Sequence, residues 1–147
     1  MQIQKEDTDK KRKDGMIEAW FVIEAMGMTR EVVESSLNNH YSNLESENGI
    51  YVYEKHFSEI KAVDVEGKEA YSQLVDVKLF AKDLITLMSV VLLYGPSAVE
   101  VLGPKKKEIE MGEIQNICNA VAGLLHQFAS AGAGGIVIAP DKKRRAE

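Results

Sequence analysis

The chain of 147 residues is long enough for one domain with its own core, but too short for two of ordinary size. Its 45% hydrophobic and 28% charged residues are typical of an ordinary globular protein. The net charge of −5 is unevenly spread, because residues 15–140 hold nine basic and seventeen acidic residues, whereas both ends carry basic clusters. This acidic body excludes a nucleic-acid footprint that covers the whole domain.

Residues 1–15 contain almost no apolar side chain and are predicted to form a basic disordered tail. Residues 141–147 are predicted to form a second basic tail, so that residues 16–140 make a single domain. The first residues lack an apolar stretch typical of a signal peptide. Cys118 is the only cysteine, so no intrachain disulfide is possible, and we expect a reducing, cytoplasmic location without a membrane contact.

The first half of the domain reads as strand, helix and strand. Residues 17–26 are rich in β-branched and aromatic side chains, and Thr29 is a suitable N-cap for the helix that follows. Asn48-Gly49 ends that helix, because either residue can adopt the left-handed conformation. Residues 50–60 then form an aromatic strand with a bulge expected near His56-Phe57, and residues 61–70 can extend it into a hairpin.

The second half repeats this order. Apolar and polar residues alternate over 74–80, which predicts a strand buried on one face. Asp83 is a suitable N-cap, and Gly95-Pro96 stops the next helix. Residues 97–102 form another strand before the Gly103-Pro104 break.

Two strand–helix–strand units predict an α+β fold of the ferredoxin-like (βαββαβ) type, with a four-stranded antiparallel sheet and two helices on one face. A third, amphipathic helix opens near Gly112 and adds to this domain at its C-terminal end. Its apolar face must be covered, either by the sheet of the same chain or by a second copy. Apolar and aromatic positions that we predict to form an oligomer interface are Tyr51, Tyr53, Phe57, Ile117, Val121 and Phe128.

The aromatic residues of the 50–60 strand allow two interpretations. Tyr51 and Tyr53 are expected to share one face, which is also the geometry with which RNA-binding sheets stack bases. Acidic Glu54 and Glu59 stand where such a platform carries basic residues, which favours packing in the core or at a dimer interface.

Three basic runs are candidates for contacts with phosphates, as an alternative to ordinary solvated segments, since such contacts need little more than cations. Nothing in the sequence brings the three runs together. The residues are Lys10, Lys11, Arg12, Lys13, Lys105, Lys106, Lys107, Lys142, Lys143, Arg144 and Arg145.

No catalytic, metal or cofactor site is predicted. His40 has no second histidine at the helical spacing that a metal site needs. Cys118 and His126 are about 12 Å apart along one helix, too far for a nucleophile and base. The glycines of 132–135 follow a helix, the reverse of a phosphate loop. A small enzyme that uses the acidic body is a third hypothesis, without a placed acid and base.

The run that starts at Asp83 and reads LYGPSAVEVLGP over residues 93–104, followed by a helix, resembles the C-terminal extension of WYL-domain regulators. The order of elements over about 17–130 is similar to that extension and to ACT-type regulatory domains. The resemblance implies a ferredoxin-like module for oligomerisation and response to a ligand or partner. No WYL domain or winged helix precedes the run in this sequence, so DNA binding is not expected.

The sequence thus predicts a non-catalytic regulatory or interaction module that forms a homo-oligomer and responds to a small-molecule ligand or a partner. The alternative is a factor associated with RNA or the ribosome, which contacts phosphates through the basic tails.

Overall fold

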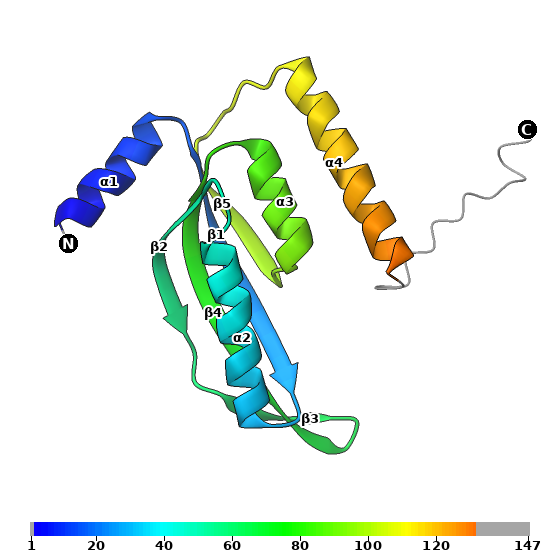
Figure 1. The fold of residues 1–147 in the computed structure, drawn as a ribbon. Coiled ribbons are helices and arrows are strands. Elements are labelled where there is room, and N and C mark those ends of the chain that lie inside the picture. Colours follow the sequence, from blue (N-terminus) through cyan, green and yellow to red (C-terminus); the bar gives the residue numbers. More distant parts are fainter. Residues whose placement is uncertain (1, 132–147) are drawn as a thin grey trace, which may run out of the picture. The chain divides into compact units, whose positions relative to one another are not determined.

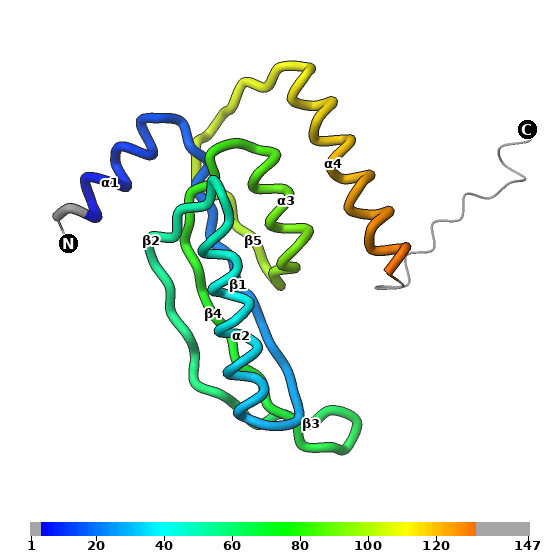
Figure 2. Tube along the Cα trace, in the orientation of Figure 1, coloured from blue at the N-terminus to red at the C-terminus, as the bar shows by residue number. Residues whose placement is uncertain are grey.

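The structure is a computed structural model that describes residues 2–131 (Figures 1 and 2). The predictions for the glycines of 132–135 and for the basic tail 141–147, with its residues 142–145, therefore lie outside the described residues. The elements, in chain order, are α1 (Gln2–Lys13), β1 (Ile17–Gly27), α2 (Arg30–Glu45), β2 (Ile50–Phe57), β3 (Lys61–Val65), β4 (Lys68–Ala81), α3 (Leu84–Tyr94), β5 (Ala98–Gly103) and α4 (Met111–Ser130).

The described residues form an α+β structure with one five-stranded antiparallel sheet, in the order β2-β4-β1-β5, and β3 also pairs with β4. The long strand β4 lies at the centre of these pairings. Its Tyr71 and Ser72 pair with β1 on one side and with β3 on the other. Strands β2 and β3 consequently follow one another along the same edge of β4.

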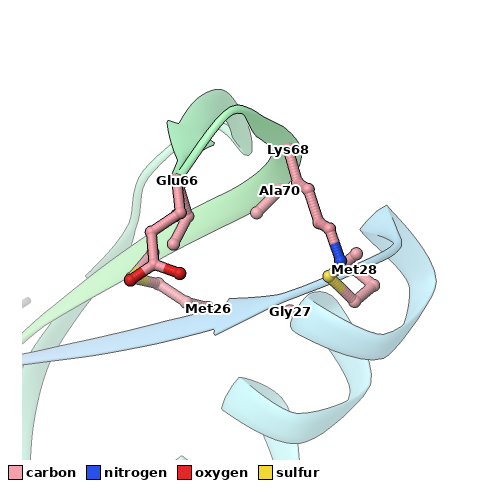
Figure 3. A pocket seen from close by; sticks show the side chains of 7 residues that line it. Met26, Gly27, Met28, Glu66, Lys68 and Ala70 are labelled. Carbon is pink, nitrogen blue, oxygen red and sulfur yellow. The ribbon is translucent and has the colours of Figure 1, made fainter.

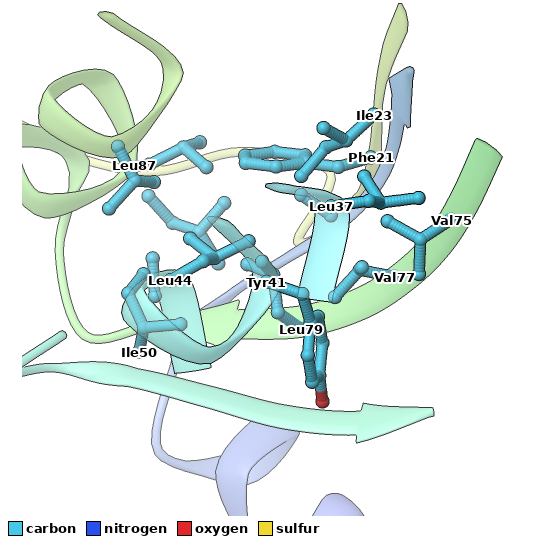
Figure 4. Packing of buried hydrophobic residues seen from close by; sticks show 14 residues of the cluster. Phe21, Ile23, Leu37, Tyr41, Leu44, Ile50, Val75, Val77, Leu79 and Leu87 are labelled. Atoms are coloured by element: carbon cyan, nitrogen blue, oxygen red, sulfur yellow. The ribbon is translucent and has the colours of Figure 1, made fainter. Parts of the chain in front are cut away.

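Helices α2 and α3 cover one face of the sheet, and their apolar side chains share one core with β1, β2 and β4 (Figure 4). Leu37 and Leu44 of α2 and Leu87 of α3 lie in this cluster with Phe21 and Leu79 of the sheet. The alternation predicted for the strand over 74–80 is confirmed, since Val75, Val77 and Leu79 are fully buried.

The ends of α2 and α3 are set by the residues that the sequence indicates. Thr29 Oγ1 accepts a hydrogen bond from Val32 N at 3.1 Å, and Asp83 Oδ1 accepts one from Thr86 N at 2.9 Å. Each satisfies one of the amide groups that the first turn of a helix leaves unpaired. Gly95 ends α3 in the left-handed conformation, with φ of 53°.

The bulge lies in β2, but not at the predicted position. The register of β2 against β4 shifts between Val52 and Glu54, so Tyr53 is the extra residue, and His56 and Phe57 continue the regular pairing. A bulge depends on the partner strand, and the alternation of side chains along one strand locates it poorly.

The N-terminal segment is helix α1, which differs from the predicted disordered tail. The Lys11 ammonium lies 2.8 Å from Asp7 Oδ1, one turn earlier, and this spacing supports a helix. Thr8 is buried and Arg12 pairs with Glu18 of β1. The helix is thus held by polar contacts that a count of apolar residues does not reveal.

The chain divides into two units with a boundary after residue 109, and this boundary falls inside the single domain predicted over 16–140. The second unit contains α4, which begins at Met111, close to the predicted opening at Gly112. Over residues 2–131 we find no helix with the length and apolarity that a membrane crossing requires.

Candidate interaction surfaces

Two of the three predicted basic runs lie at one end of the sheet. Lys107 Nζ donates a hydrogen bond to the carbonyl oxygen of Gly15 at 3.1 Å, which ties the segment after β5 to the end of α1. Arg12 and Lys105 line the same pocket of about 340 Å³, together with Met16 and Pro104. The structure therefore joins the runs 10–13 and 105–107, and the third run lies outside the described residues.

Arg12 is the most constrained cation of this basic end. Its Nε and Nη2 donate to the two carboxylate oxygens of Glu18 at 2.9 and 3.0 Å, and its Nη1 donates to Asp9 at 3.1 Å. The hydrogen bonds from Arg12 hold the pKa of the Glu18 carboxyl below its usual range, and a hydrogen bond from the Tyr53 hydroxyl adds to this effect. Arg12 thus anchors α1 to the sheet.

The aromatic residues predicted for an interface do not form a single surface. The Tyr53 ring packs 5.1 Å from Phe80, on the face of the sheet opposite α2 and α3, and Lys11 of α1 lies 4.9 Å above the Tyr51 ring. Phe57 packs edge-to-face against Tyr41 of α2 at 5.6 Å and belongs to the opposite face. Tyr51 and Tyr53 therefore lie on one face of the sheet and Phe57 lies on the other.

The other predicted interface residues, Ile117, Val121 and Phe128, lie in α4, where their spacing places them on one face of the helix.

A second pocket, of about 330 Å³, lies where the hairpin of β3 and β4 meets the end of β1 (Figure 3). Met26 and Met28 are 54% and 65% exposed, and Val65 is 41% exposed. Glu66 and Lys68 stand on the hairpin side of this Met-lined pocket. Close apolar side chains that stay in solvent are typical of a docking surface.

A glycine lies in the wall of the Met-lined pocket. A Cβ added to Gly27 would lie 3.1 Å from a methyl group of Val33, a fully buried residue of α2. The absence of a side chain thus lets β1 and α2 approach closely at this end of the sheet.

Two features of the sequence point to this pocket, and neither enters the predictions. Methionines at 26 and 28 surround the glycine that ends β1, and Glu66-Gly67 joins two segments with alternating apolar residues. Neither signal by itself shows that the end of β1 and the hairpin turn meet, because β4 makes that connection.

The exposed face of the sheet carries a network of polar side chains that satisfy one another. Trp20 Nε1 donates to Asp76 at 3.1 Å, and Lys78 lies 5.0 Å above the Trp20 ring and 3.2 Å from Glu54.

His40 makes a hydrogen bond of 2.8 Å with the carbonyl oxygen of Tyr94. Within residues 2–131, no three His, Cys, Asp or Glu side chains gather as metal ligands.

Comparisons with known proteins place the chain in a family. No curated protein and no solved structure matches it. The sequence model of the MJ0538 family matches residues 18–147, a range that takes in the five described strands, apart from Ile17 at the start of β1, and the helices α2, α3 and α4. The chain therefore belongs to the MJ0538 family.

Proposed function

We propose that this chain is a small non-catalytic interaction module that self-associates. The observation that supports the proposal is the Met-lined pocket, whose Met26, Met28 and Val65 side chains remain largely in solvent. Methionine is flexible and polarisable, so it suits a surface that has to adapt to a partner. Burying these side chains against a partner would remove apolar area from water, which favours association.

We also infer that the sheet is a variant of the ferredoxin-like arrangement. Strands β2 and β3 follow one another along one edge of β4 and count as one interrupted strand. When β2 and β3 are counted as one strand, the strands of the two strand–helix–strand units interleave in the sheet, as they do in a split βαβ fold. The likeness to WYL-domain extensions and ACT-type domains remains a prediction, as does a cytoplasmic location.

Self-association is tested by size exclusion with light scattering, on the full chain, at concentrations from low to hundreds of micromolar. We expect the mass to rise from that of one chain towards that of two, because a small apolar patch supports an association of moderate strength. A mass of one chain over the whole range would reject the proposal.

A second candidate function is contact with RNA phosphates, and the specific observation in its favour is the meeting of the runs 10–13 and 105–107. Lys105, Lys106 and Lys107 are exposed at this basic end, where counterion release would drive binding. The affinity for a single-stranded RNA should fall steeply as salt rises.

The matched test replaces Lys105, Lys106 and Lys107 with glutamate and compares this variant with a triple charge reversal at Lys55, Lys61 and Lys82, which are also exposed. Fluorescence anisotropy with labelled RNA measures the RNA affinity of both variants. Loss of binding in the first variant alone supports the basic end as the site, and equal binding by both variants rejects it.

A further inference from the structure

We infer that the Met-lined pocket is the contact between two copies of this chain, related by a two-fold axis, with Glu66 of each copy opposite Lys68 of the other. The inference rests on the proposed self-association and adds the surface and the pairing. It is carried by an exposed apolar pocket that has one acidic and one basic side chain beside it.

The charges and the methionines of the pocket are arranged in two halves. Figure 3 shows the Glu66 carboxylate directed towards Met26, and the Lys68 side chain directed towards Met28. A two-fold axis places one half of a surface on the other half of its copy. Such an axis through this pocket therefore brings each carboxylate to an ammonium group and packs methionine against methionine.

The hairpin turn holds these two charges on a defined backbone. Glu66 and Gly67 both have positive φ, 52° and 81°, which is the conformation of a two-residue type I′ turn. Val65 pairs with Lys68 across that turn, and the ladder continues through Asp64 and Glu69. The paired strands thus fix where Glu66 and Lys68 emerge, and a pre-ordered surface loses less entropy on association.

The chemistry of the pocket favours a second copy over other occupants. A strongly charged partner would meet one side chain of its own sign, since Glu66 and Lys68 nearly cancel. A purely apolar partner would leave both charged groups without a partner at the rim of the contact. A copy of the same surface is apolar at the centre and complementary at both charges.

The test uses two charge reversals on the full chain, E66K and K68E, each measured by sedimentation equilibrium alone and as an equimolar mixture. Each variant alone places like charges opposite one another at two symmetric positions, and its dimer dissociation constant should rise about tenfold or more. In the mixture, two cations of one chain face two anions of the other, and a heterodimer of at least wild-type affinity should form.

The double variant E66K/K68E exchanges the two charges and should dimerise like the wild type. E100K in β5 and K55E in β2 are matched controls, because these exposed residues lie outside the pocket. Circular dichroism and thermal unfolding confirm that each variant is folded.

The outcomes separate this inference from the proposed function. A wild-type dimer that E66K and K68E leave unchanged, or whose variants weaken without recovery in the mixture, overturns the paired hairpin surface while self-association stands. A wild-type chain that stays monomeric overturns both. Dissociation of each variant with recovery in the mixture supports the inference.

Discussion

The guanidinium group of Arg12 in α1 and the carboxylate of Glu18 in β1 form a two-point ion pair, with N–O distances of 2.9 and 3.0 Å. Glu18 is only 9% exposed, and its Oε2 also accepts a hydrogen bond from the Tyr53 hydroxyl. The Arg12 guanidinium also lies 5.7 Å above the ring of Phe80, which is fully buried. One pair of residues therefore joins α1 to β1, β2 and β4.

Replacement of Arg12 by alanine should loosen α1 and lower the free energy of unfolding by about 1–2 kcal/mol, because the Glu18 carboxylate would lose its partner in a nearly buried position. Urea denaturation measures the free energy, and hydrogen exchange reports on the amides of α1. Lys13→Ala, an exposed change in the same turn, is the control. Equal effects of the two changes would contradict the anchoring role of Arg12.

The stability of the α1 contact should depend on pH. The pKa of the Glu18 carboxyl is lowered in the folded chain, chiefly by the hydrogen bonds from Arg12. A lowered pKa means that the ionised carboxylate adds stability above the ordinary carboxyl range, and that this stability is lost as pH falls through the lower folded-state value.

Glu18→Gln isolates this pH effect, since the amide cannot ionise and keeps a similar shape. Urea denaturation from neutral to acidic pH should show a lower stability of the variant at neutral pH and a weaker loss on acidification than in the wild type. Parallel pH profiles of the two proteins would assign the acid sensitivity to other carboxyl groups.

The features that the sequence predicts well are those set by a few neighbouring residues. Thr29 and Asp83 cap their helices within three residues, and Gly49 and Gly95 have positive φ, 86° and 53°. The bonds of a cap and the freedom of glycine at positive φ act over one turn of chain. The strand alternation over 74–80 is predicted for a similar reason, since it needs only one buried face.

Features that depend on distant residues could not be predicted in the same way. The bulge at Tyr53 is defined only against β4, and α1 is held by Glu18, Tyr53 and Phe80, which its own composition does not indicate. The Met-lined pocket needs β4 to bring Glu66 and Lys68 to the end of β1. Long-range pairing, and not local preference, determines these sites.

The cap of α3 gives a local prediction. Asp83→Ala should cost about 1 kcal/mol of stability, because the amide of Thr86 would lose the carboxylate that accepts its hydrogen bond. Asp83→Asn, which retains a capping oxygen, should cost much less, and urea denaturation at neutral pH compares the two. If alanine and asparagine were equally tolerated, the capping bond would contribute nothing measurable.

Tyr94 at the end of α3 predicts a change in stability at alkaline pH. Burial, and then a hydrogen bond of 2.6 Å to Glu47, raise the pKa of Tyr94 to about 12. A raised pKa means that the protonated phenol adds stability below the ordinary tyrosine range, and that this stability is lost as pH rises through about 12.

Tyr94→Phe removes both the hydrogen bond and the titration. Its stability at neutral pH should be lower by about 1 kcal/mol, and its decline at high pH should be less steep than that of the wild type. Ultraviolet titration of tyrosinate in both proteins should show that the phenol lost in the variant is one that ionises above the ordinary tyrosine range. If the lost phenol ionised within the ordinary range, the raised pKa of Tyr94 would be contradicted.

Met28→Asp should weaken self-association without lowering the thermal midpoint, because Met28 is 65% exposed and contributes little to the core of one chain. Leu93→Asp is the matched control, since Leu93 is 47% exposed on α3 and does not line the Met-lined pocket. Light scattering at a fixed concentration compares the two masses. If Leu93→Asp dissociated the protein and Met28→Asp did not, the contact would lie instead beside β5, where Val99 and Val101 are also exposed at the sheet edge.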